Sequence, residues 1–99
     1  MKISKSRDAS DNLTVSIDKM PVFKYRFIRW LICKQFGLKK HSKYVQGLNE
    51  RFQTFQGEAG QVSIEWDAWS GFIVSAVDKD SETLLEQIHS WLEKRYKNV

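Results

Sequence analysis

The second half of the sequence changes from a strand pattern to a helix pattern, and this change most restricts the possible folds. Val62, Ile64 and Trp66 alternate with polar residues, which is typical of a half-buried strand. The break that follows reads DAWSG, and Gly71 can supply the positive φ that a short hairpin loop needs. The apolar run 72–77 then predicts a return strand, which we place at the centre of a sheet.

An amphipathic helix is predicted directly after this hairpin, at 82–96. Asp80 and Ser81 are alternative N-caps, and Glu82 favours the positive end of the helix dipole. The apolar side chains recur at i, i+1, i+4, i+7 and i+8. They are Leu84, Leu85, Ile88, Trp91 and Leu92. We expect this face to be buried against the sheet.

The first half of the sequence predicts one strand and two helices. Apolar residues alternate over 13–17, which indicates a half-buried strand. The segment 22–36 is too long for a typical strand and ends before a glycine at 37, so we predict a helix. Its expected buried side carries Phe23, Phe27, Trp30 and Leu31, widened by Ile28 and Ile32.

A further helix is predicted from Ser42, a plausible N-cap, to the stretch QGEAG. Its apolar residues at helical spacing are Tyr44, Val45, Leu48, Phe52 and Phe55. The element order is then β-α-α-β-β-α, an α+β fold with a small three-stranded antiparallel sheet and two to three helices on one face. Ninety-nine residues form one domain, which we place at 12–99, after a flexible N-terminal arm or short edge strand at 1–11.

The residues available for chemistry are few, and they predict a protein that is not an enzyme. His41 lies in a basic loop and His89 flanks the apolar side of the last helix. No His or Cys pair has metal-ligand spacing, and no glycine-rich phosphate loop follows a strand, so we expect no metal and no cofactor. Cys33 is a single cysteine in an apolar run, and the polar N-terminus lacks the features of a secretory signal. We therefore expect a cytoplasmic protein without disulfides.

Charge is unevenly distributed along the chain. Residues 1–49 contain eleven Lys or Arg and three Asp, whereas 50–99 contain five Lys or Arg and nine acidic residues. From 19 to 43 there are eight basic residues, interleaved with aromatic ones, and no acidic residue. Such a segment suits phosphates and unpaired bases. The candidate polyanion contacts are Lys24, Arg26, Arg29, Lys34, Lys39, Lys40 and Lys43.

The composition of the basic segment is also compatible with roles that involve no polyanion. Its rings can be core residues while its charges are solvated, and the basic half can instead face the acidic half of the same domain or of a partner copy. An anionic membrane surface suits the same composition, although we do not expect it, and no segment is long and apolar enough to span a bilayer.

The hairpin tip EWDAWSG is the second candidate site. Trp66 continues the inward face of its strand, whereas Trp69 lies in the turn and either folds over the hairpin or anchors a partner. Glu65 and Asp67 share the opposite strand face and are candidate partner contacts. The sequence therefore predicts a small non-enzymatic interaction protein, with a protein partner or with self-association; the alternative is a nucleic-acid-binding protein that uses 19–43.

Overall fold

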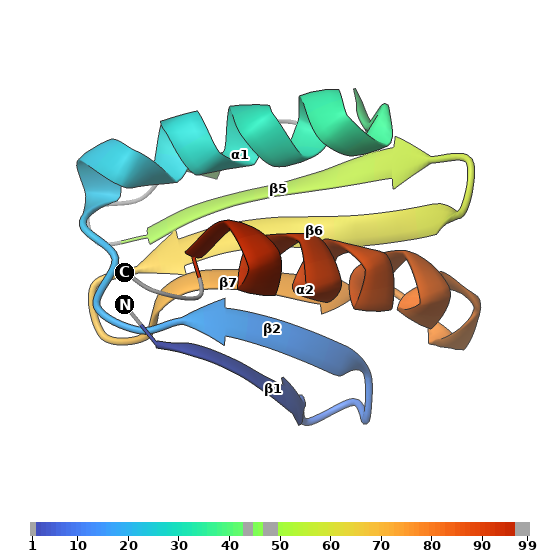
Figure 1. Cartoon of the computed structure of the whole chain (residues 1–99), viewed down its shortest axis with the longest axis horizontal. Coiled ribbons are helices and arrows are strands. Elements are labelled where there is room, and N and C mark those ends of the chain that lie inside the picture. The colour runs from blue at the N-terminus through green and yellow to red at the C-terminus, as the bar shows by residue number, and fades with distance from the viewer. Residues whose placement is uncertain (1, 43–44, 47–49, 97–99) are drawn as a thin grey trace.

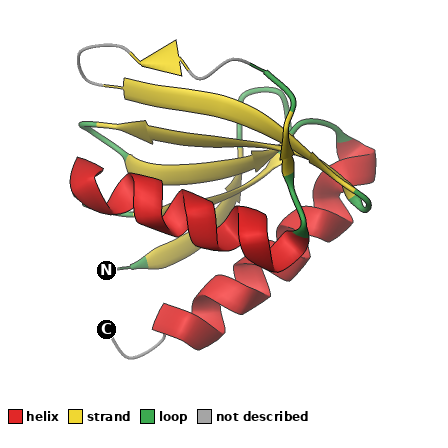
Figure 2. Ribbon diagram, turned by 90° about the horizontal axis from the view of Figure 1, so that it is seen from above, coloured by secondary structure: helices red, strands yellow, loops and turns green. Residues whose placement is uncertain are grey.

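Two helices cover one face of an antiparallel sheet (Figures 1 and 2). The computed structural model describes residues 2–42, 45–46 and 50–96. The elements in chain order are β1 (Ile3–Arg7), β2 (Leu13–Ile17), α1 (Val22–Phe36), β3 (Lys39–Lys40), β4 (Val45–Gln46), β5 (Glu50–Gly57), β6 (Gly60–Asp67), β7 (Gly71–Ala76), a 3₁₀ turn η1 (Lys79–Ser81) and α2 (Glu82–Tyr96). The strand order is β1-β2-β7-β6-β5-β3, and the short β4 also pairs with β5.

The hairpin and the last helix form where the sequence predicts them. β6 and β7 pair in antiparallel register from Val62 opposite Ala76 to Asp67 opposite Gly71. β7 lies between β2 and β6, inside the sheet. α2 covers 82–96 and buries Leu84, Leu85, Ile88 and Leu92, while Trp91 is half-buried against the core. Asp80 and Ser81, the predicted N-caps, lie in the 3₁₀ turn that precedes α2, and Asp78 caps this turn by accepting a hydrogen bond from the Ser81 backbone N–H at 2.9 Å.

The predicted sheet of three strands and the predicted helix from 42 to 55 are both wrong. The segment 50–57 is strand β5, which pairs with β6 along its whole length, and this pairing makes the element order β-β-α-β-β-β-β-β-α. Phe52 and Phe55, which sit at helical spacing, instead point to opposite faces of β5, opposite Glu65 and Val62. Tyr44 and Leu48 lie outside the described residues. β6 follows β5 after only two residues, and hairpin pairing with this neighbouring strand outweighs the helical periodicity.

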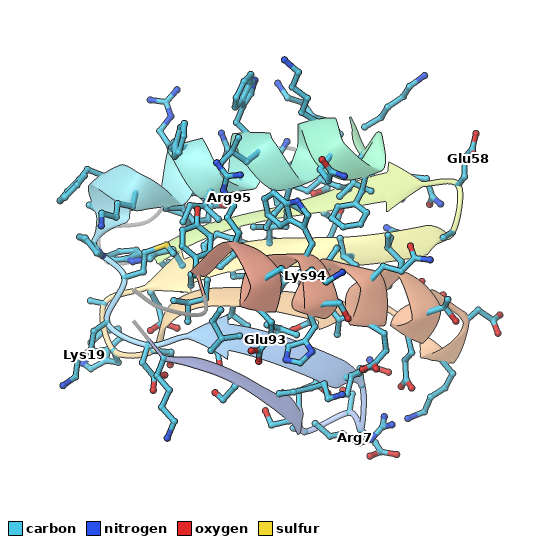
Figure 3. The ribbon with its side chains drawn as sticks, in the orientation of Figure 1. Arg7, Lys19, Glu58, Glu93, Lys94 and Arg95 are labelled. Carbon is cyan, nitrogen blue, oxygen red and sulfur yellow. The ribbon has the colours of Figure 1, made fainter. Side chains whose placement is uncertain are left out.

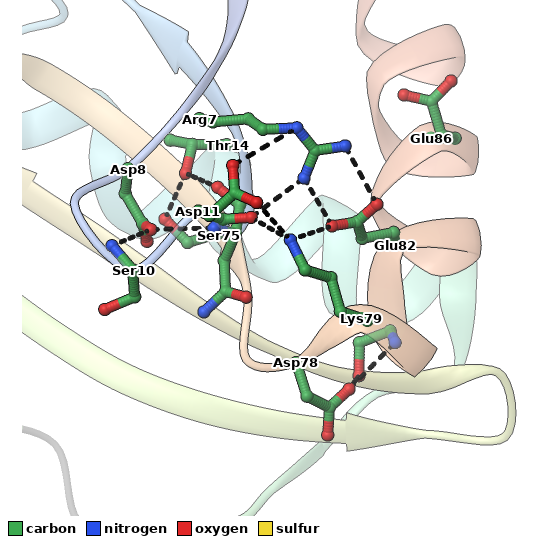
Figure 4. A network of polar contacts seen from close by, with 12 residues as sticks. Arg7, Asp8, Ser10, Asp11, Thr14, Ser75, Asp78, Lys79, Glu82 and Glu86 are labelled. Atoms are coloured by element: carbon green, nitrogen blue, oxygen red, sulfur yellow. Dashed lines mark hydrogen bonds and ion pairs between the residues drawn. The ribbon is translucent and has the colours of Figure 1, made fainter.

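The N-terminal segment belongs to the sheet. Ile3–Arg7 forms the edge strand β1, which pairs with β2. Of the two predictions for 1–11, a flexible arm or a short edge strand, the structure therefore shows the edge strand. Ion pairs connect the β1–β2 hairpin to the 3₁₀ turn and the first residue of α2 (Figure 4). Arg7 Nη1 lies 2.7 Å from Glu82 Oε2, and Lys79 Nζ lies 3.0 Å from Asp11 Oδ2. The hydrogen bond from Arg7 lowers the pKa of Glu82, and that from Lys79 lowers the pKa of Asp11. These contacts stabilise the fold above the ordinary carboxyl pKa and are lost as pH falls through the lowered values.

Candidate functional site

Helix α1 carries two apolar sides, and the structure buries the side of Ile28 and Ile32, which we placed at the edge of the expected buried face. Tyr25, Ile28 and Ile32 face the sheet, whereas Phe23, Phe27 and Trp30 face outward. The predicted assignment of those three rings to the core is therefore wrong. Tyr25 suits the inner side because its hydroxyl donates to the Ile64 carbonyl at 3.1 Å. Its ring also packs against Phe72, with centroids 5.8 Å apart.

The outward rings form an exposed apolar row along α1. Phe23 is 75% exposed, Phe27 56% and Trp30 53%. Their spacing of i, i+4 and i+7 places them on one side of the helix, one turn apart. Phe27 and Trp30 stack on each other, with centroids 6.4 Å apart and planes within 25°. Such a contiguous row on a small protein is typical of an interaction surface.

Three of the predicted polyanion contacts accompany these rings. Lys24, Arg26 and Lys34 are exposed on α1, whose outer side chains project away from the sheet (Figure 3). The Lys34 ammonium lies 4.9 Å from the centre of the Trp30 ring, which is a cation–π contact. We call the surface formed by Phe23, Phe27 and Trp30 with these three cations the aromatic–basic face.

The other predicted cations are placed differently. Arg29 is half-buried and turned toward the core, with its guanidinium 5.2 Å from the centre of the Tyr25 ring. Lys39 and Lys40 are exposed in β3, just after the helix. Lys40 and Trp30 line one hollow of about 270 Å³ beside α1, so the basic surface continues from the helix toward the sheet edge. Lys43 lies outside the described residues.

The three candidate contacts at the hairpin tip, Glu65, Asp67 and Trp69, have different surroundings. Trp69 is 82% exposed, whereas Trp66 packs against the core and donates from Nε1 to the Met20 carbonyl at 2.7 Å. Asp67 closes the turn by accepting the backbone N–H groups of Trp69 and Ser70. Glu65 is half-buried, and burial raises the pKa of its carboxyl although Ser63 donates to it at 3.1 Å. Glu65 and Trp69 line the same hollow on the sheet face that the helices leave uncovered.

His89 and Cys33 lie outside the two candidate surfaces, and each contacts its own helix or the core. His89 Nε2 lies 3.1 Å from Glu93 Oε1, one turn along α2. Cys33 is half-buried, and burial raises the pKa of its thiol to about 11, so the thiolate is scarce at neutral pH. Within residues 2–42, 45–46 and 50–96, no group of three or more His, Cys, Asp or Glu side chains could hold a metal ion.

Comparison with models of protein families, with curated proteins and with solved structures finds no match for this chain. Among the described helices, none has the length and apolar character needed to cross a membrane.

Replacing Trp69 with alanine is expected to change the free energy of unfolding by less than about 0.5 kcal/mol, because the ring is exposed. Urea denaturation followed by circular dichroism measures this change. Trp66→Ala is the control from the same hairpin, and it should cost about 3 kcal/mol because that ring packs against the core. A similar loss for Trp69→Ala would show that its ring holds the hairpin together.

Proposed function

We propose that this protein is a non-enzymatic nucleic-acid-binding protein and that its aromatic–basic face binds a single strand. The observation that carries the proposal is the exposure of Phe23, Phe27 and Trp30 between cations. Burying three such rings in a partner would remove a large apolar area from water. Flat rings beside positive charges match a ligand that carries both stacking surfaces and phosphates.

A single strand fits this face better than a duplex does. Bases in a duplex are already stacked and paired, whereas unpaired bases offer their faces to protruding aromatic side chains. Lys24, Arg26 and Lys34 lie close enough to the rings to neutralise the phosphates of the stacked nucleotides. Lys39 and Lys40 extend the positive charge beyond the end of the helix.

Lys34 also argues against an anionic membrane as the ligand. Seven residues after Phe27 and four after Trp30, it extends the row of rings by one helical turn, with its ammonium over the indole. An interfacial helix keeps its charges on the side away from the acyl chains. A phosphate beside a stacked base, in contrast, requires a cation at such a position.

Fluorescence anisotropy of a labelled oligonucleotide tests the proposal. A single strand of about 12 nucleotides falls within the usual site size of roughly 4–16. Trp30→Ala should weaken binding by about 5- to 150-fold, which corresponds to roughly 1–3 kcal/mol per stacked base. Trp69→Ala is the matched control, because it removes an exposed indole from another surface and should leave the affinity unchanged.

The dependence on salt tests the charges separately from the rings. Three phosphate contacts predict a slope of roughly −2 for the logarithm of the binding constant against the logarithm of salt concentration. Lys24→Glu with Lys34→Glu should flatten the slope, whereas Lys94→Glu on α2 should change it little. Absence of binding at about 50 mM salt would overturn the proposal. Binding to anionic vesicles without binding to the oligonucleotide would instead identify a membrane surface.

A further inference from the structure

The uncovered face of the sheet carries a row of hydroxyl side chains that crosses five strands. The strand register places Ser6 beside Thr14, Thr14 beside Ser75, Ser75 beside Ser63, and Ser63 beside Thr54. Thr14 and Ser75 are hydrogen-bonded at 3.1 Å, and both are more than nine-tenths buried. These residues lie far apart in the sequence, so only the assembled sheet brings them into one row.

Small side chains in the middle of this face leave a hollow, which we call the open-face trough. Its volume is about 570 Å³, and Ser6, Thr14, Ser16 and Ser75 contribute to its lining. The larger side chains around it are Asp8, Asp18, Glu65, Trp69 and Ile73. None of the described lining residues is cationic. The trough therefore combines negative charge and hydroxyl acceptors with one exposed indole.

The trough and the aromatic–basic face are complementary surfaces of the same chain. The first carries three carboxylates, an indole and an isoleucine, whereas the second carries three cations and three rings. A helix of 15 residues is about 22 Å long and roughly 10–12 Å wide, a convex shape that suits a shallow trough between raised side chains. Opposite charges steer such surfaces together and suppress wrong orientations.

We propose that the aromatic–basic face of one molecule docks into the open-face trough of a second copy. In this arrangement Lys24, Arg26 and Lys34 face the carboxylates of the trough, and the rings of α1 contact Trp69 and Ile73. This inference stands apart from the proposed nucleic-acid binding, because it concerns the protein alone, although both use the outer side of α1.

The positions of the two surfaces determine the kind of assembly. The helices lie on one side of the sheet (Figure 2), whereas the residues that line the trough belong to its other side. A molecule whose α1 is docked still offers its own trough to a third copy. The contact is therefore head-to-tail, and repetition produces short chains of molecules rather than a closed pair. The area beneath one helix is small, so we expect weak association that depends on concentration and salt.

Sedimentation velocity of the full chain without nucleic acid tests this inference. At low salt the average mass should increase at least about twofold as the protein concentration rises toward about 1 mM, the range of weak contacts. At about 1 M salt, where the screening length is about 3 Å, the protein should sediment as a monomer. A wild-type protein that stays monomeric at low salt over this whole range would overturn the proposal.

Two blocked variants identify the surfaces. Phe27→Ala with Trp30→Ala removes exposed rings of the helix contact but keeps its cations. Asp18→Lys with Glu65→Lys reverses the charge of the trough, so the two altered surfaces repel each other. Each variant alone should be monomeric at low salt. A mixture should form a one-to-one dimer and nothing longer, because each variant keeps one working surface and those two surfaces match.

The mixture experiment also defines what contradicts the proposal. Association of either variant alone to the wild-type extent would show that its altered surface is not used. A mixture that stays monomeric although the wild type associates would exclude the pairing of these two surfaces. Should the trough variant fail to fold, Asp18→Lys alone replaces it, because Asp18 is exposed and lies outside the strands.

Discussion

Replacing Ile88 with aspartate is expected to abolish the cooperative unfolding transition. Ile88 is 0% exposed and lies on the side of α2 that packs against β2, β6 and β7. An unpaired carboxylate there costs several kcal/mol, which is a large part of the roughly 5–15 kcal/mol that stabilises a domain. Thermal and urea denaturation, followed by circular dichroism, should show a chain that is largely unfolded at about 25 °C.

Neighbouring substitutions separate the buried charge from other effects on the helix. Gln87→Asp puts the same side chain on the exposed side of α2 and should cost less than about 1 kcal/mol. Ile88→Val removes one methylene group and should cost about 0.5–1.5 kcal/mol. An Ile88→Asp protein with the wild-type thermal midpoint would show that this side of α2 does not face the core.

Among the glycines that the structure describes, Gly71 should tolerate an added methyl group (Gly71→Ala) least. Gly71 begins β7 with φ +82°, a region that side chains disfavour by about 1–2 kcal/mol. An added Cβ would lie 2.5 Å from the Ile17 carbonyl oxygen and 2.9 Å from the Lys19 backbone nitrogen. Because both are main-chain atoms, at the end of β2 and just after it, a rotamer change cannot relieve the contact. We expect a loss of about 3 kcal/mol or more in the free energy of unfolding.

Gly37→Ala is the matched control for this substitution. Gly37 ends α1 with φ +63°, so it carries a similar backbone penalty, but a Cβ there would meet nothing within 4 Å. This change should cost only about 1–2 kcal/mol in urea denaturation. Equal losses at the two glycines would mean that the close approach between Gly71 and the chain after β2 does not affect stability.

Local patterns predicted α2 and the β6–β7 hairpin correctly because each presents a single apolar side. In α2, polar residues occupy the other sides of the helix, so only one side can be buried in the core. That side carries Leu84, Leu85, Ile88 and Leu92. In the hairpin, the alternation around Ile64 and the positive φ of Gly71 agree on the same turn. Where only one arrangement buries the apolar residues, the sequence is sufficient to predict both the element and its buried side.

In α1 the sequence determined a helix and a basic composition, but the tertiary structure decided which rings are exposed. Two apolar rows lie on opposite sides of this helix, so periodicity cannot distinguish between them. The choice depends on the sheet, where the Ile64 carbonyl accepts from Tyr25 and Phe72 packs against its ring. The candidate binding surface is the row that remains outside.

Strand pairing, both between neighbouring segments and between distant ones, decided the rest. The residues 50–57 have helical spacing, yet they form β5 because β6 offers partners along its whole length. The same pairing aligns Ser6, Thr14, Ser75, Ser63 and Thr54. By itself the sequence determined the helices α1 and α2, the β2 strand, the β6–β7 hairpin and the uneven distribution of charge. Only the assembled sheet decided which side chains became neighbours, because register and burial depend on residues that are far apart in the chain.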